Sequence, residues 1–228
     1  MKKLFKIIGI LILAVGIAIA AYYYANNESV PTGKQGVEAD ALATKMLQAI
    51  NHDAYTTTRF LEWSFRERHV YKWDKQQHIV EVQWANIKAI LHTKSPEKNK
   101  LFVDGELTED KELIQKAIDY FNNDSFWLVA PHKVFEDGIE RRLVTYNNKK
   151  ALLVTYTIGG STPGDSYLWI LDEDGLPTSY KMWVSIIPAG GMEATWDDWI
   201  TTASGTKLPT THKILSRELD MGDVKGYH

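Results

Sequence analysis

The sequence predicts a mainly β protein with helices (α+β), built from roughly ten antiparallel strands and two or three helices. Apolar and polar residues alternate over most of the chain, which is typical of half-buried antiparallel strands. The stretch 159–183 reads as a loop, an aromatic strand, an Asp-Glu-Asp-Gly turn and a second aromatic strand. Helical spacing is confined to a few segments between the strands, so sheets make up most of the fold.

The composition narrows the functional classes. A chain of 228 residues fits one domain, and its net charge of −3 suggests no polyanionic partner. The only basic cluster is Lys2, Lys3 and Lys6, so we expect no nucleic-acid binding. The chain contains no cysteine, which excludes disulfides, thiolate metal sites, cysteine nucleophiles and a lipid-modified N-terminal cysteine.

Residues 1–24 are expected to be a signal peptide or an N-terminal membrane anchor. Three lysines precede an uncharged apolar run, and Ala18-Ile19-Ala20 resembles a cleavage site. The stretch Ile7–Tyr24 is also just long enough to form a transmembrane helix. Either reading predicts the cell envelope: a protein anchored in the membrane and facing the periplasm or extracytoplasmic space, or a secreted one. Residues 25–36 are polar and are expected to form a linker that packs against nothing.

Residues 37–228 are expected to form one domain. Val37–Asn51 has an apolar stripe at helical spacing and is expected to cover a sheet. Period-two alternation then predicts strands joined as sequential hairpins. The residues that alternate there are Leu61, Trp63 and Phe65; His69, Tyr71 and Trp73; Val80, Val82 and Trp84; Ile87, Ala89 and Leu91; and Leu101 to Val103.

The second half of the domain begins with a predicted helix, Glu109–Asn122, which Thr108 is expected to cap. The apolar stretch Asn123–Gly138 predicts a short helix and a buried arm, because it is too apolar for an ordinary loop. Alternating residues then predict strands at Ile139–Tyr146 and Ala151–Ile158. The aromatic hairpin follows, and further strands are expected around 195–201 and 207–218.

The order of helix, strands, helical insert and strands resembles the lipoprotein-carrier (LolA/LolB-like) superfamily. The hairpin from Tyr167 to Asp172 and on to Pro177 is similar to that family's strand, Asp, turn, Leu-Pro, strand unit. The stretches Phe126–Pro131 and Phe135–Gly138 are similar to envelope proteins of Bacteroidetes with this fold. The resemblance implies a curved antiparallel half-barrel whose concave apolar face is lidded by helices. The missing cysteine departs from the family's lipid-anchored acceptor.

Aromatic side chains on the predicted strand faces are the candidate ligand-binding groups. They could line an apolar cavity or fill an ordinary core, and the sequence leaves both readings open. The residues concerned are Trp63, Phe65, Tyr71, Trp73, Val82, Trp84, Trp127, Trp169 and Met182.

No motif indicates catalysis, a metal or a cofactor. The loop 159–166 lacks the patterns of a phosphate loop or a nucleophile elbow, and Asp172–Gly175 is expected to be a β-turn. The histidines are scattered without metal-ligand spacing. A hydrolase using Asp165 and His132 is a remote third reading, so we expect no enzyme.

The expected function is therefore binding. The sequence indicates an exported, membrane-tethered protein that binds a lipid or a lipoprotein acyl chain in the cell envelope. Its expected partners are that ligand, the membrane through residues 1–24, and an envelope protein that the sequence does not identify. The alternative is a non-catalytic structural or interaction module of the envelope with a filled core and no ligand.

Overall fold

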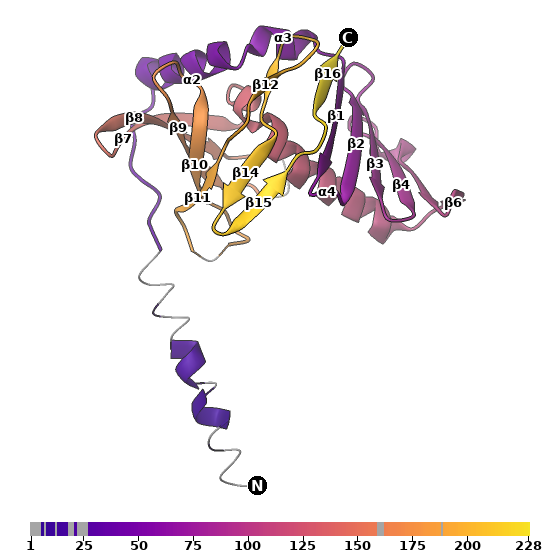
Figure 1. Cartoon of the computed structure of the whole chain (residues 1–228), viewed down its shortest axis with the longest axis horizontal. Helices are drawn as coiled ribbons and strands as arrows, with labels where there is room; N and C mark the ends of the chain where they lie inside the picture. Colours follow the sequence, from indigo (N-terminus) through magenta and orange to yellow (C-terminus); the bar gives the residue numbers. More distant parts are fainter. Residues whose placement is uncertain are drawn as a thin grey trace.

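The computed structural model describes residues 6, 8–11, 13–17, 21, 27–158, 162–187 and 189–228. Most of the expected signal peptide or anchor therefore lies outside the described residues. Its described apolar side chains, such as Ile10 and Leu13, are exposed, and Figure 1 shows these turns away from the body of the protein. Among the described residues, no helix combines the length and apolar character needed to cross a membrane.

Two seven-stranded sheets, in which every pairing is antiparallel, form the body. The first sheet has the order β16 (Lys225–Tyr227), β1 (Phe60–Phe65), β2 (His69–Asp74), β3 (Ile79–Trp84), β4 (Ile87–His92), β5 (Lys100–Val103), β6 (Glu106–Thr108). The second has the order β15 (Arg217–Asp220), β14 (Thr211–Ile214), β11 (Met192–Thr195), β10 (Pro177–Trp183), β9 (Ser166–Leu171), β8 (Lys149–Tyr156), β7 (Ile139–Tyr146). Strands β12 (Ile200–Thr201) and β13 (Lys207–Leu208) pair separately.

The C-terminal segment joins the two sheets along β1. The Ser64 and Arg66 amides donate hydrogen bonds to the carbonyls of Met221 and Asp220, and β16 then pairs with the start of β1. Neither sheet closes on itself, because β6 and β7 remain outer strands. The predicted α+β class of open antiparallel sheets is confirmed. The described residues form sixteen strands rather than roughly ten, since several strands are too short to show a period in the sequence.

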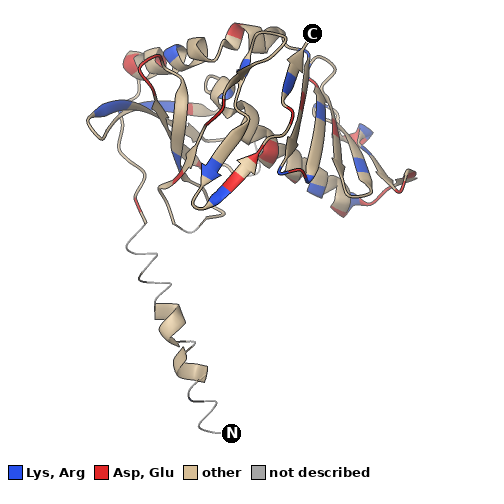
Figure 2. Cartoon of the chain, viewed as in Figure 1, with Lys and Arg blue, Asp and Glu red and all other residues tan. Residues whose placement is uncertain are grey.

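Within the described residues from 27 onward, three α-helices and two 3₁₀ turns accompany the sheets: α2 (Val37–Ala49), α3 (His52–Thr57), η1 (Pro96–Lys98), α4 (Lys111–Val129) and η2 (Ala130–Lys133). Figure 1 shows α4 running across the sheets on one side and α2 and α3 along one end. We call the side that carries α4 the inner face. Figure 2 shows Lys and Arg interspersed with Asp and Glu over the body.

Helix α4 begins and ends at other residues than the sequence predicts. Its cap is Asp110 rather than Thr108, because the Asp110 carboxylate accepts hydrogen bonds from the Glu112 and Leu113 amides, each at 3.0 Å. The helix continues to Val129, so half of the predicted arm belongs to it. The next part of the arm is buried as expected, with Pro131 in η2 and Val134 after it, but residues 135–137 are exposed, so the prediction of a buried arm is wrong there.

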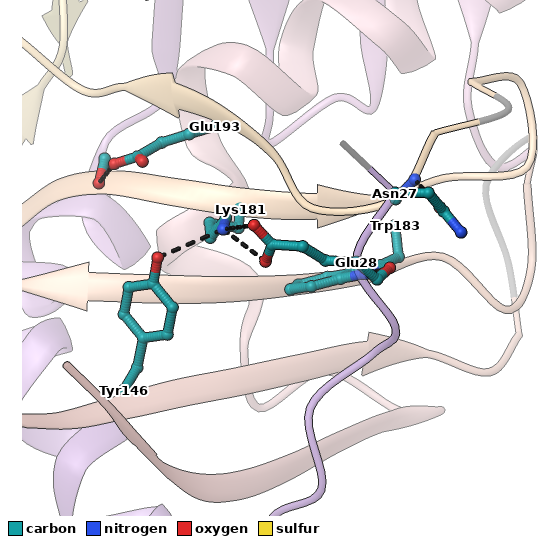
Figure 3. A network of polar contacts seen from close by, with 8 residues as sticks. Asn27, Glu28, Tyr146, Lys181, Trp183 and Glu193 are labelled. Carbon is teal, nitrogen blue, oxygen red and sulfur yellow. Dashed lines mark hydrogen bonds and ion pairs between the residues drawn. The ribbon is translucent and has the colours of Figure 1, made fainter. Parts of the chain in front are cut away.

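Residues 27–36, which we call the strap, are bonded to the outer face of the second sheet. The Glu28 carboxylate pairs with the Lys181 ammonium, whose side chain is only 7% exposed (Figure 3). The Trp183 indole donates a hydrogen bond of 2.8 Å to the Glu28 carbonyl, and Lys34 exchanges two backbone hydrogen bonds with Leu143 of β7. The expectation that this segment packs against nothing is therefore wrong.

Glycine makes this close approach possible. A Cβ atom on Gly190 would lie 2.7 Å from the Glu28 carbonyl oxygen and 2.3 Å from a ring carbon of Trp183. Both distances are shorter than van der Waals contact, so a larger residue would push the strap away. The polar residues of the strap do not indicate this docking, because its partners lie more than 100 positions further along the chain.

Candidate functional site

The inner face of the first sheet is an aromatic surface covered by α4. Alternation along β1 and β2 turns Trp63 and Tyr71 toward the helix, where they are paired across the strands and their rings stack at 4.5 Å. Phe121 of α4 packs over them and meets the Trp73 ring edge-on at 5.2 Å. On β3, Trp84 contacts Tyr120 of α4 in the same edge-on manner.

The inner face of the second sheet carries a further aromatic cluster. Trp169, Tyr180 and Trp196 contact one another with ring centroids 4.9–5.7 Å apart. Helix α2 covers part of this face, because the small side chains of Ala39 and Ala43 let it approach closely. The end of α4 covers the adjoining part.

The structure brings the predicted ligand-binding residues into two packed clusters. Trp127 packs against both clusters and lies between the two sheets. Of the nine predicted residues, Trp73 and Trp127 are partly buried and the others are buried. The first cluster holds Trp63, Phe65, Tyr71, Trp73, Val82 and Trp84, and the second holds Trp169 and Met182.

Several polar atoms under this cover lack a hydrogen-bond partner among the described residues. They are the indole nitrogens of Trp63, Trp73, Trp169 and Trp196, the hydroxyl of Tyr156 and Nε2 of His212. Buried polar atoms usually have a partner, and leaving one without a partner costs about 1–3 kcal/mol. The covered arrangement is therefore less stable than a fully hydrogen-bonded core of the same size.

A buried carboxylate also lies beneath α4. Asp124 is 1% exposed and accepts hydrogen bonds from the Tyr71 hydroxyl at 2.5 Å and from Asn123 at 2.8 Å, while His69 Nδ1 lies 2.7 Å away. Burial raises the pKa of Asp124, and these three contacts oppose that rise. We call Asp124, Tyr71 and His69 the latch, because they join α4 to β2 through polar contacts within an apolar interface.

An open pocket of about 460 Å³, which we call the rim pocket, lies where α3, the turn after β2 and the segment around η2 meet. Aromatic, imidazole and ammonium groups line it together. They include Tyr55, Trp73 and Phe135; His52, His78 and His132; Lys75 and Lys133; and the carboxylate of Glu136.

Two histidines form a relay in the pocket wall. The Nε2 atom of His132 lies 3.3 Å from the Lys207 carbonyl oxygen, which only accepts, so Nε2 carries the proton. Burial lowers the pKa of His132 to about 3, so the ring is neutral near pH 7 and its Nδ1 accepts. His52 Nδ1, 3.3 Å away, therefore donates to it. This leaves His52 Nε2 as a proton acceptor, with the His52 pKa lowered mainly by burial.

Lys75 has an unusual environment in the same pocket. Its ammonium lies 3.4 Å from the centroid of the Tyr55 ring and donates a hydrogen bond to the Tyr55 carbonyl. Burial, assisted by the charge of Lys133, lowers the pKa of Lys75 to about 8. Among the described residues Lys75 forms no ion pair, whereas Glu136 lies 4.0 Å from Lys133.

The other groups considered from the sequence have structural roles. The Gly175 amide donates a hydrogen bond of 3.2 Å to the Asp172 carbonyl, which confirms the predicted β-turn, and the Asp172 carboxylate accepts from the Asp174 and Leu176 amides. Asp165 contacts Thr162 and the Ser185 amide, whereas His132 contacts His52 and Lys207, so the two supposed hydrolase residues have different partners. Within the described ranges, no group of three or more His, Cys, Asp or Glu side chains could hold a metal.

Sequence reasoning missed the rim pocket. His52 and His132 are 80 positions apart, and α3 is too short to show a helical period. The local sequence around Lys75 is typical of a polar turn and does not indicate a pocket. Only the packing of η2 against α3 brings these groups together.

No protein-family model and no curated protein matches the chain. A search of solved structures finds a DUF1329 family protein from Desulfovibrio piger ATCC 29098, with a TM-score of 0.44 and 9% sequence identity. The match covers 82% of this chain and 92% of the Desulfovibrio chain.

Proposed function

We propose that this chain is a non-catalytic, extracytoplasmic binding protein for an apolar ligand, a lipid or an acyl chain, tethered to the membrane through residues 1–24. The observation that carries the proposal is the aromatic inner face, which extends over both open sheets and is covered by helices rather than by a third sheet. In the binding-competent form α4 leaves this face and the ligand takes its place.

Two features of the cover support this movement. The indole donors of Trp63 and Trp73, which pack against Phe121 of α4, have no hydrogen-bond partner among the described residues, so separating α4 from the sheet exposes them to water or to a ligand's ester and carboxyl oxygens. Asp124 is buried under the helix with a raised pKa, so its ionised form favours the uncovered arrangement. Both effects reduce the free energy required to displace α4.

A distance measurement on the full chain in lipid nanodiscs tests the proposal. The chain has no cysteine, so nitroxides can be placed at Lys116→Cys on α4 and Lys72→Cys on the outer side of β2. Adding a long-chain fatty acid is expected to lengthen the distance between the two labels. Native mass spectrometry of the same sample is expected to show the bound lipid.

The alternative, a structural or interaction module with a filled core, is favoured by one observation. Seven of the nine predicted cavity residues are buried in packed clusters. On that reading the label distance stays constant, no lipid co-purifies and no acyl probe binds. That combination would exclude the binding function.

A further inference from the structure

We propose that the rim pocket binds the anionic headgroup, a carboxylate or a phosphate, of the apolar ligand. This inference rests on the proposed function and adds a polar end to it: the headgroup lies against Lys75 while the chain lies on the aromatic inner face under α4. Three features of the pocket support it, namely its unpaired charge, its histidine relay and its continuity with that face.

The charge is the first feature. Lys75 is partly buried beside the Tyr55 ring and forms no ion pair among the described residues. Burying an ammonium without a counter-charge is costly, and Glu136, the one carboxylate among the lining residues, lies toward Lys133. A ligand carboxylate or phosphate supplies the missing negative charge and forms a charge-assisted hydrogen bond.

The histidine relay is the second feature. Because His132 is held by Lys207 and by His52, the imidazole of His52 is fixed with its Nε2 as an acceptor. An anion placed beside this ring favours its protonated form, which adds a second positive charge and a second donor. The pocket can therefore increase its positive charge when an anion binds.

Continuity with the covered face is the third feature. Trp73 lines the rim pocket, and its ring also meets Phe121 of α4 edge-on at 5.2 Å in the first cluster. A headgroup beside Lys75 therefore lies at the border of the aromatic surface. A volume of about 460 Å³ exceeds what a carboxylate or phosphate needs, so the first methylene groups fit against Trp73 and Phe135.

The experiment separates the contribution of the headgroup charge to affinity from the contribution of the acyl chain. Energy transfer from tryptophan to cis-parinaric acid and to its methyl ester is titrated on the full chain in nanodiscs, with empty nanodiscs as background. The two probes share one chain and differ only in the ionised carboxylate. We expect the wild type to bind the acid roughly 10- to 100-fold more tightly than the ester, as expected for a hydrogen bond to a charged group.

Three variants test whether Lys75 causes the difference in affinity between the acid and the ester. Lys75→Met is expected to reduce acid affinity to that of the ester and to leave ester affinity unchanged, which also shows that the variant is folded. Lys75→Arg retains the charge and is expected to retain the discrimination. Lys213→Met removes an exposed lysine on β14, away from the residues that line the pocket, and is expected to change neither affinity.

The outcomes distinguish the two proposals. If the wild type binds neither probe, the binding function fails and this inference fails with it. If acid and ester bind equally well, or Lys75→Met weakens both alike, the function stands and the headgroup site is refuted. Comparing how well oleate and oleoyl lysophosphatidate displace the bound acid shows whether the site prefers a carboxylate or a phosphate headgroup. Displacement by inorganic phosphate alone would refute a headgroup site in favour of a free-anion site.

Discussion

Lys75 is an ammonium in surroundings that favour the neutral amine. The Tyr55 ring and carbonyl hold it in place, while burial and then the charge of Lys133 lower its pKa to about 8. A lysine left in this environment without a carboxylate contributes little to folding stability. In the proposed headgroup site its contribution is to binding, because an incoming anion compensates for the lost solvation of the charge.

The affinity for cis-parinaric acid is therefore expected to depend on pH. Binding requires the protonated amine, so affinity should fall by up to tenfold per pH unit above about pH 8, where Lys75 loses its proton. The ester should show no such fall. Lys133, Glu136, His52, His78 and His132 also face the pocket, so each variant must be titrated over the same range, pH 7 to 10, as the wild type.

Lys75→Arg provides the control for that titration. A guanidinium stays charged throughout this range, so the decline should disappear in the variant. A decline of equal steepness in Lys75→Arg would show that another group of the pocket carries the pH dependence.

Helix α4 is held to the sheet by two kinds of contact. Its apolar stripe packs on aromatic side chains of β1 to β3 and aliphatic side chains of β4 and β5, and Asp124 of the latch binds Tyr71 and His69. Packing of this kind is non-directional, whereas the latch fixes one position of the helix. The latch bonds exist only while α4 covers the sheet, so weakening them shifts the equilibrium toward the uncovered form.

Tyr71→Phe tests this role. Losing the hydroxyl bond to the buried Asp124 is expected to destabilise the covered form by about 1–3 kcal/mol. Association of cis-parinaric acid should then be faster, by about tenfold for each 1.4 kcal/mol if uncovering limits the rate. Stopped-flow energy transfer measures this rate, and thermal unfolding measures the loss of stability.

Tyr227→Phe is the matched control. Its hydroxyl also donates to a carboxylate, Glu62, at 2.6 Å, but on the outer side of β1. The variant loses the same type of bond without touching α4, so its association rate should equal that of the wild type. Equal rates in Tyr71→Phe and Tyr227→Phe would contradict the latch.

The sequence predicted the elements with strong periods and missed those defined by contacts. The alternation of Trp63, Tyr71 and Val82 placed them on one face, as the structure shows. The sequence prediction ended α4 too early at Asn122: no glycine or proline stands between Asn122 and Pro131 to break the helix, and α4 continues to Val129. The rim pocket and the latch could not be predicted, because their partners meet only after α4 and η2 pack.

At the scale of the whole molecule, two open sheets share one inner face and the strap fixes one end of the outer face. The C-terminal segment joins the sheets at β1, so the aromatic surface is continuous across the junction. Burial by itself would lower the pKa of Lys181, but its bonds to Glu28 and Tyr146 outweigh this and raise it. The strap is thus attached to the sheet by a mostly buried charge.

Glu28→Gln is expected to release the strap. It leaves the buried Lys181 ammonium without its carboxylate and should lower the unfolding free energy by about 1–2 kcal/mol, a range reduced because Glu28 is half exposed. Because the Lys181 pKa is raised, the stabilisation in the wild type is present at neutral pH and is lost above pH 10.5. Hydrogen exchange of residues 27–36 should increase.

Glu38→Gln serves as the comparison, since Glu38 pairs with Lys150 where both side chains are about two-thirds exposed. A change within roughly 0.5 kcal/mol is expected there, because exposed ion pairs contribute little. Unchanged exchange of the strap in Glu28→Gln would show that the backbone bonds of Lys34 and the indole bond of Trp183 hold it without the ion pair.

The docked strap limits how far the domain can stand from the bilayer. Glu28 is four residues after Tyr24, the end of the proposed anchor, and a fully extended chain spans at most about 3.5 Å per residue, so the attachment point lies within roughly 14 Å of that end. A free linker of residues 25–36 would have more than doubled this stand-off. If residues 1–24 anchor the chain as proposed, the protein would sample a thin layer of space beside one membrane, where the local concentration of that membrane's lipids is high. Such a protein would bind lipid beside one membrane and would not carry it between two membranes.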